Sequence, residues 1–237
     1  MTRLLPTAFL LVAAAAANAQ SIPGAVLAKR EPHHHIMFQD STLRVLRVRV
    51  PAHDTTQLHE HDPDYFWIAL GASTVVNAKR GSPDATISSA DLSIHYTPGR
   101  FAHVARNPGT KPFDNITVEL LRPQTNVRNL CEPALADKPL ACPEAATPVT
   151  PGASEHPAFS TDALRVSLVT IAPGGTLRPT TNAKRTWLIA LDTVDAERRL
   201  RFADHARWIG GTRRVEKDWS LENVARAPVR VITVVER

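Results

Sequence analysis

The residues best suited to chemistry are three histidines in the first half of the chain. His59 and His61 are separated by one residue, so on a strand both imidazoles would point to the same face. His103 follows about forty residues later and would supply a third ligand from a neighbouring strand. Such a facial arrangement leaves coordination positions open, which is typical of catalytic metal sites. We therefore predict one divalent transition metal, and imidazole ligands tolerate Fe, Cu, Mn, Zn or Ni.

Two further side chains are candidates for catalysis. Tyr65 lies four residues after His61, and His95 lies on the expected strand that precedes His103. Either could hold or move a proton beside the metal. The alternatives are a core position for Tyr65 and a surface position for His95. The run of histidines at 33–35 lacks a spaced partner, so we expect it to be solvated or to lie at a sheet edge.

The chain contains a long internal repeat. Shifted by 121 positions, residues 43–45 match 164–166 and residues 68–70 match 189–191. A repeat unit of this length indicates a duplicated domain. The second copy has lost its histidines, and poor metal ligands stand at the three positions: Thr180 and Asn182 for His59 and His61, and, after one residue of slip, Asn223 for His103. We expect the second half to bind no metal.

Short apolar segments separated by glycine and proline turns dominate both halves. Residues 43–50 alternate with period two, so Leu43 and Val45 are expected on one face and Leu46, Val48 and Val50 on the other. Strands are expected at 43–50, 65–70, 73–76, 84–88, 91–96, 116–121, 164–172, 185–191, 199–204 and 229–235. Regularly spaced short strands predict an all-β antiparallel sandwich or barrel.

Two motifs surround the three histidines. The first is His59-Glu-His61-Asp-Pro-Asp-Tyr65-Phe-Trp-Ile-Ala-Leu-Gly71, and the second is Pro98-Gly99-Arg-Phe-Ala-His103-Val-Ala-Arg-Asn107. In this order they resemble the two motifs of the cupin family. The family usually adds a glutamate four or five residues after the second histidine, where this chain has Tyr65 and Phe66. The resemblance implies two tandem jelly-roll barrels, the second degenerate, and a site of three histidines plus solvent.

The sequence also predicts where the domains begin and end. Residues 1–19 have the features of a signal peptide, with Arg3, an apolar run and a small-residue cleavage site, so we expect a periplasmic or secreted protein. The first barrel should span 20–122 and the second 154–237. A Pro-rich linker, 123–153, contains the only two cysteines, Cys131 and Cys142, which we expect to form a disulfide.

Charge and composition restrict the partners. The net charge is +5, and arginines crowd late in the chain without interleaved aromatic residues, which favours a solvated face over a nucleic-acid surface. No segment after the signal peptide is long and apolar enough to span a membrane. The expected partners are a small-molecule substrate or ligand and, from the resemblance, a second copy of the chain in a homodimer.

Two classes of function remain open. One is a metal-dependent enzyme, with a dioxygenase-like oxidoreductase as the leading hypothesis and an isomerase or lyase as an alternative. The other is a non-catalytic module that binds a metal or a small molecule such as a saccharide. A titratable group pointing inward beside the metal, from His95, Asp64 or Tyr65, would favour the enzyme.

Overall fold

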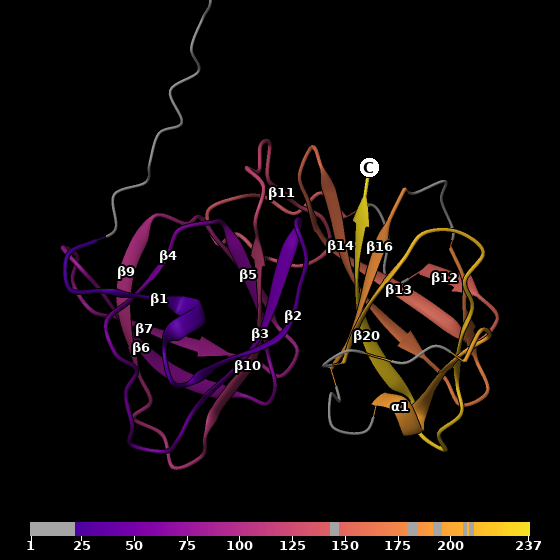
Figure 1. Ribbon diagram of the computed structural model, residues 1–237, viewed down its shortest axis with the longest axis horizontal. Coiled ribbons are helices and arrows are strands. Elements are labelled where there is room, and N and C mark those ends of the chain that lie inside the picture. The colour runs from indigo at the N-terminus through magenta and orange to yellow at the C-terminus, as the bar shows by residue number, and fades with distance from the viewer. Residues whose placement is uncertain (1–21, 143–146, 180–183, 192–195, 206–207, 209–210) are drawn as a thin grey trace, which may run out of the picture.

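Two β-barrels lie side by side in the computed structural model (Figure 1), the first in indigo to magenta and the second in orange to yellow. The structure describes residues 22–142, 147–179, 184–191, 196–205, 208 and 211–237. Strands make up most of both barrels, in agreement with the all-β prediction. Among the described residues no helix has the length and apolar character needed to cross a membrane. The predicted signal peptide, 1–19, lies outside the described residues.

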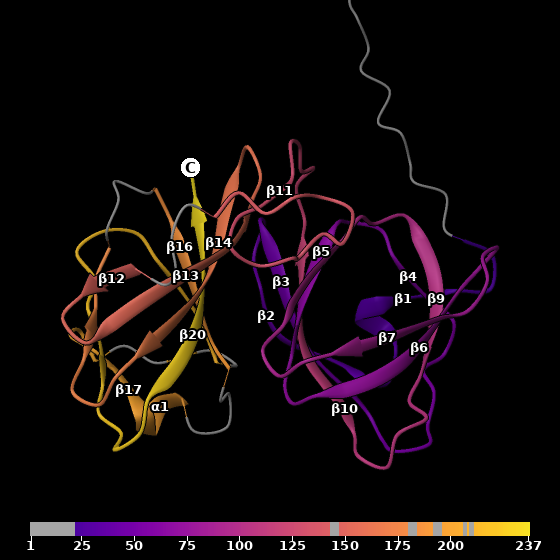
Figure 2. The same cartoon turned by 180° about the vertical axis from the view of Figure 1, so that it is seen from behind.

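The first barrel consists of two five-stranded sheets, which Figure 2 shows from behind. The first sheet contains, in spatial order, β1 (Val26–Leu27), β4 (His59–His61), β9 (Phe101–Arg106), β6 (Ser73–Lys79) and β7 (Ala85–Ser89). The second sheet contains β2 (His34–Gln39), β3 (Leu43–Val50), β10 (Phe113–Leu120), β5 (Tyr65–Ala69) and β8 (Ile94–Thr97). A short 3-10 turn, η1 (Ala28–Arg30), joins β1 to β2.

The second barrel has a larger and a smaller sheet. The larger contains β11 (Arg128–Asn129), β13 (Ala153–Ser160), β14 (Leu164–Ile171), β20 (Val229–Glu236), β16 (Thr186–Ala190) and β18 (Thr212–Val215), with β12 (Thr147–Thr150) paired to β13. The smaller contains β15 (Thr176–Leu177), β19 (Leu221–Asn223) and β17 (Leu200–Phe202). A single helical turn, α1 (Ala196–Arg199), precedes β17.

The alternation in β3 separates two apolar layers. Leu46, Val48 and Val50 point into the first barrel, where they join the core with side chains of both sheets. Leu43 and Val45 point outward and belong to a different cluster, which also contains residues of β13, β14, β16 and β20. The predicted two faces of this strand are therefore both buried, one inside the barrel and one between the barrels.

This second layer joins the barrels into one body. The rings of Phe66 and Phe159 meet edge to face, with their centroids 5.3 Å apart. Trp187, which is fully buried, donates a hydrogen bond from its indole nitrogen to Asp40 in the first barrel at 2.8 Å. Because apolar faces of both barrels would otherwise meet water, this contact contributes to the stability of each.

The repeat is visible in the strand pairing. β3 and β14 begin 121 residues apart, as do β5 and β16, which matches the shift found in the sequence. Phe113 of β10 pairs with Val50, and Val229 of β20 pairs with Ile171, the counterpart of Val50. Phe113 and Val229 are therefore equivalent, and the shift between the copies has fallen to 116 residues at this point. The second copy is therefore five residues shorter between these points, and the one-residue slip assumed from the sequence is too small.

Two asparagines locate the correct alignment of the last motif. Asn107 donates from Nδ2 to the carbonyl of Val50, the last residue of β3, at 3.0 Å. It also donates to the carbonyl of Lys111, four residues after itself. Asn223 makes the equivalent two contacts, with the carbonyl of Ile171, the last residue of β14, and with that of Ala227, four residues after itself. Asn223 is thus the counterpart of Asn107, not of His103, and the predicted match of Asn223 with His103 is wrong. Counting back four residues, the counterpart of His103 is Trp219.

The segment expected as a linker carries structure of its own. Both β11 and β12 lie within residues 123–153, and both pair with β13. Cys131 and Cys142 form the predicted disulfide, with eleven residues of sequence separation. The disulfide and these short pairings fasten the connection to the edge of the second barrel.

Candidate metal centre

The short strand β4 carries the two central histidines inward. His59 and His61 are 1% and 2% exposed, and they lie on one side of the strand. His59 is paired with His103 across β4 and β9, and their ring centroids are 4.3 Å apart. The three histidines predicted from the sequence therefore do come together from two adjacent strands.

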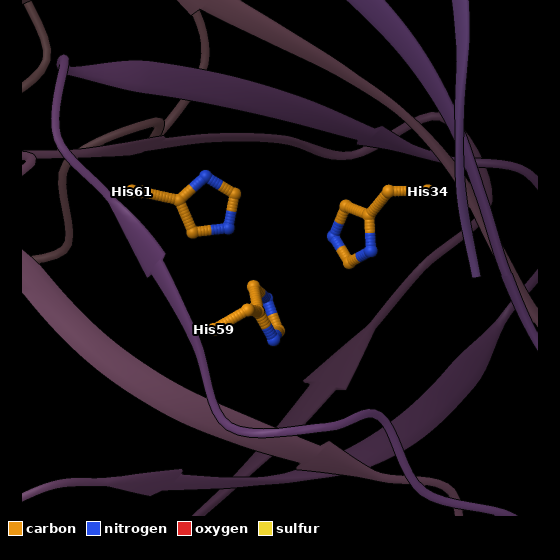
Figure 3. A group of neighbouring side chains, drawn as sticks. All are labelled: His34, His59 and His61. Atoms are coloured by element: carbon orange, nitrogen blue, oxygen red, sulfur yellow. The ribbon is translucent and has the colours of Figure 1, made fainter. Parts of the chain in front are cut away.

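A fourth histidine, His34, joins them from the opposite sheet. Figure 3 shows the rings of His34, His59 and His61 pointing toward a common centre. One potential ligand atom from each of the three lies within 4.8 Å of the others. The expectation that the run 33–35 is solvated or at an edge is wrong for His34, which is buried at the head of β2.

The sequence did not reveal this role of His34. In a run of three histidines, polar and apolar residues do not alternate, so the pattern does not show which side chain points inward. His35 is exposed, and His33 bonds to carboxylates outside the cluster of inward histidines. The available signal was Glu31, an acidic residue three positions before His34. Glu31 is 1% exposed and lies 2.6 Å from Nδ1 of His34. A buried carboxylate needs partners of this kind, so the pair could have been suspected.

Each of the four histidines has an oxygen acceptor at its Nδ1 atom. The acceptors of His34 and His61 are carboxylates, Glu31 at 2.6 Å and Glu119 at 3.3 Å. His59 meets the backbone oxygen of Gln57 at 2.9 Å, and His103 meets the side-chain oxygen of Asn77 at 2.7 Å. Since an oxygen acceptor holds the proton on Nδ1, the lone pair of each ring is placed on Nε2. Acceptors of this type commonly orient histidine ligands of metals.

Burial favours the neutral form of His59, His61 and His103. Burial, together with the neighbouring histidines, lowers the pKa of His59 to about 3 and that of His103 to about 2. Burial also lowers the pKa of His61, against the opposing effect of Glu119. A neutral imidazole is the form that ligates a metal, so no proton must leave these rings near neutral pH.

The donor set fits a divalent transition metal. His103 Nε2 is buried and has no hydrogen-bond partner among the described residues. An unsatisfied buried nitrogen is costly, and a metal shared with the neighbouring rings would remove that cost. A set of imidazole nitrogens without a carboxylate suits a divalent transition metal and does not suit Ca or Mg.

Tyr65 lies directly beside this cluster. Its ring stacks on His61 with centroids 4.1 Å apart, and its hydroxyl is hydrogen-bonded to Thr97. Burial raises the pKa of Tyr65 well above its ordinary value, against the opposing effect of the Thr97 bond. Tyr65 therefore stays protonated and can donate a hydrogen bond, whereas it cannot act as a base near neutral pH.

His95 and Asp64 lie apart from the inward histidines. His95 stacks on Trp67 at 4.2 Å, and its Nε2 meets the Ser93 hydroxyl at 2.9 Å. Asp64 accepts hydrogen bonds from Tyr96 and from the backbone of Gly99, which fixes the start of the second motif. Of the three groups that would indicate catalysis, the described structure brings only Tyr65 to the histidines.

A small cavity adjoins the four histidines and Tyr65. Its volume is about 70 Å³, and apolar side chains such as Val48, Val75 and Phe113 form much of the wall. A water molecule occupies about 30 Å³ of liquid, so the space admits only a few non-hydrogen atoms. Neither lysine nor arginine is among the described residues of this wall.

The second barrel has different residues at the two counterparts that are described. Glu155 takes the position of His34, since both pair with equivalent valines of the next strand. Trp219 takes the position of His103. Thr180 and Asn182, the predicted counterparts of His59 and His61, lie outside the described residues.

Known proteins resemble this chain in structure, whereas the sequence comparisons found no match. No protein-family profile matches the chain. No curated protein matches it in sequence. The solved structure of AerE from Microcystis aeruginosa is similar with a TM-score of 0.60 at 11% identity, covering 87% of this chain and 93% of AerE.

Oxalate decarboxylase of Bacillus subtilis gives a similar result. One single-residue variant has a TM-score of 0.54 at 13% identity, and another has 0.55 at 13%. Each comparison covers 83% of this chain and 69% of the enzyme. These neighbours have the cupin fold, and the alignments extend over both barrels. The chain is therefore a two-barrel protein of the cupin fold, with a buried histidine cluster of metal-binding type in its first barrel.

Proposed function

We propose that this protein is an exported metalloenzyme that binds one divalent transition metal in its first barrel and oxidises a small organic substrate with O₂. The observation that carries the proposal is the convergence of ligand atoms from His34, His59 and His61, each ring held by an acceptor at Nδ1. His103 lies beside His59, and its buried Nε2 has no hydrogen-bond partner among the described residues. The proposed ligands are His59, His61 and His103, as expected from the sequence, together with His34 from the opposite sheet.

The residues around the site suit such a reaction. A bound metal with open coordination positions supplies Lewis acidity and, if it is iron or copper, electron transfer to O₂. Tyr65, held protonated, donates a hydrogen bond toward the cavity and orients a substrate oxygen. The apolar wall excludes bulk water and restricts the substrate to a small molecule or to the reactive end of a larger one.

The inward position of Tyr65 favours an enzyme over a simple binding module. A metal-dependent isomerase or lyase remains the alternative reaction class, since the same site could polarise a carbonyl oxygen without O₂. Decarboxylation of a dianion such as oxalate is less well supported, because the described wall contains no lysine or arginine to neutralise its charge.

Elemental analysis with oxygen-uptake assays tests this function. The chain should be exported with its own signal peptide, purified without a histidine tag and compared with the double variant His59→Ala/His61→Ala. We expect about one iron or copper per chain, lost in the variant, and O₂ consumption with small organic substrates that falls at least tenfold in Tyr65→Phe. A loaded protein that consumes no O₂ but isomerises or cleaves a substrate would support the alternative. Absence of metal after reconstitution would refute both.

Export is part of the same proposal. The disulfide between Cys131 and Cys142 fits an oxidising compartment, periplasmic or extracellular. Recovery of the mature chain, starting at Gln20, from the periplasm or the medium would support this assignment, whereas an uncleaved cytosolic chain would contradict it.

A further inference from the structure

The second barrel contains a cavity of its own, much larger than that of the first. Its volume is about 390 Å³, within the range of small-molecule sites. Its wall includes Glu155 and Trp219, the counterparts of His34 and His103. The cavity therefore occupies the place in the second barrel that the histidine cluster occupies in the first.

One row of residues explains much of the added space. In the first barrel Arg44, Glu119 and Tyr65 lie side by side across three strands, and Glu119 bonds to both Arg44 and His61. The corresponding row in the second barrel is Arg165, Val235 and Thr186. The bulky tyrosine has become a threonine and the bridging carboxylate a valine. All three residues of the second row line the cavity.

The same replacements change the chemistry from metal binding to hydrogen bonding. Arg165 is ion-paired with Glu155 at 3.2 Å, so the guanidinium retains partners although the counterpart of Glu119 is gone. Both groups keep further donor or acceptor capacity. Thr186 and Thr233 add hydroxyl groups to the wall, and Val169 and Leu177 add apolar surface.

Trp219 provides the most specific indication of a ligand. Its Nε1 atom is buried, yet it has no hydrogen-bond partner among the described residues. A buried donor of this kind is rare without an acceptor from water or a ligand. The indole also offers a flat apolar face at the same wall. The missing partner must therefore be an acceptor that can approach beside an aromatic ring.

We propose that the second barrel binds a neutral, polyhydroxylated ring, of the chemical class of a monosaccharide or cyclic polyol. Hydroxyl groups both donate and accept, so they match the carboxylate of Glu155, the guanidinium of Arg165 and the indole N–H of Trp219 together. The C–H face of such a ring packs on the indole and on Leu177. A carboxylic acid would match the donors but would meet the carboxylate of Glu155.

Saturation-transfer NMR on the full chain tests this site. The probes are D-glucose, D-galactose, D-mannose, L-arabinose and myo-inositol, each titrated with the wild type and with three variants. Trp219→Phe keeps the ring and removes the donor, and should weaken binding about fivefold to tenfold. Thr186→Tyr restores the bulk found at Tyr65 and should abolish binding. Trp208→Phe is the matched control, because Trp208 has a buried indole nitrogen in the same barrel but does not line the cavity.

Three results would decide the matter. Binding that is weakened in Trp219→Phe, lost in Thr186→Tyr and retained in Trp208→Phe would establish the site. Lack of saturation with every probe, or equal binding in all variants, would overturn the proposal. Sugar binding that is lost in His59→Ala/His61→Ala but kept in the cavity variants would also overturn it, because the sugar would then bind in the first barrel. Metal content, which should stay at one per chain in both cavity variants, confirms that they fold and separates this result from the function of the first barrel.

Discussion

His103 and Trp219 occupy equivalent positions, each four residues before an asparagine that ties its motif to the end of a central strand. In one barrel the position holds an imidazole and in the other an indole, and neither the imidazole Nε2 nor the indole Nε1 has a hydrogen-bond partner in the described part of the chain. The first nitrogen offers a lone pair and the second a proton. A single substitution thus separates a position suited to a cation from one suited to a hydrogen-bond acceptor.

Removal of His34 should weaken metal binding even though the two histidines of the first motif remain. His34 contributes one of the converging ligand atoms, so His34→Ala should raise the dissociation constant of the metal by about tenfold to a hundredfold. Competition with a chelator measures this change. His35→Ala, which removes an exposed neighbour on the same strand, is the control and should leave the affinity unchanged. Equal affinities for the two variants would restrict the site to three histidines.

Glu31→Gln should loosen the site without removing a ligand. Glu31 holds Nδ1 of His34 and also accepts the backbone N–H groups of His33 and Gln57. The amide has one acceptor oxygen instead of two, so we expect metal affinity to fall about tenfold. Glu60→Gln is the matched control, because Glu60 is buried near the site but bonds to the backbone of Ile22. If both substitutions had the same effect on affinity, Glu31 would not be a positioning residue.

The metal-free protein should lose stability as the pH falls below about 6.5. In the unfolded chain His59 and His103 take up protons near their ordinary pKa of 6.5, but in the folded chain burial holds these values at about 3 and about 2. The unfolded state then binds more protons across this window, so the free energy of unfolding decreases with falling pH, by up to about 1.4 kcal/mol per pH unit for each histidine.

Urea unfolding of the metal-free protein between pH 7.5 and pH 4 measures this slope. His33 acts in the opposite direction, because hydrogen bonds to Glu31 and Asp54 raise its pKa against the effect of burial. The variant His59→Gln should have a shallower slope than the wild type. A flat or rising stability toward low pH would contradict the buried, neutral state of these imidazoles.

Loss of the disulfide should destabilise the connection between the barrels. The bond between Cys131 and Cys142 closes a short loop, so Cys131→Ser/Cys142→Ser should lower the free energy of unfolding by roughly 2–3 kcal/mol. Thermal unfolding under non-reducing conditions gives this difference. The wild type should also show no reactive thiol after denaturation without reductant. Two thiols in that assay would refute the disulfide.

The sequence predicted the fold well because its strongest signals are local. Alternation in β3 and the two histidine motifs lie within short segments, and both appear where expected. Two features depended on distant contacts. The inward position of His34 follows from the carboxylate of Glu31 and from a sheet that faces β4, which no pattern within β2 reveals. The slip in the last motif arises from five residues lost between the repeats, and only the hydrogen bonds of the paired asparagines locate it.

The apolar layer shared by Phe66, Phe159 and Trp187 has a consequence for the second copy of the repeat. Because the two copies pack on one another, the second could not be deleted without exposing the outer apolar face of the first. The second copy therefore serves as a scaffold for the first. Substitutions in its interior leave this shared layer intact, whereas substitutions on its outer face would disrupt it.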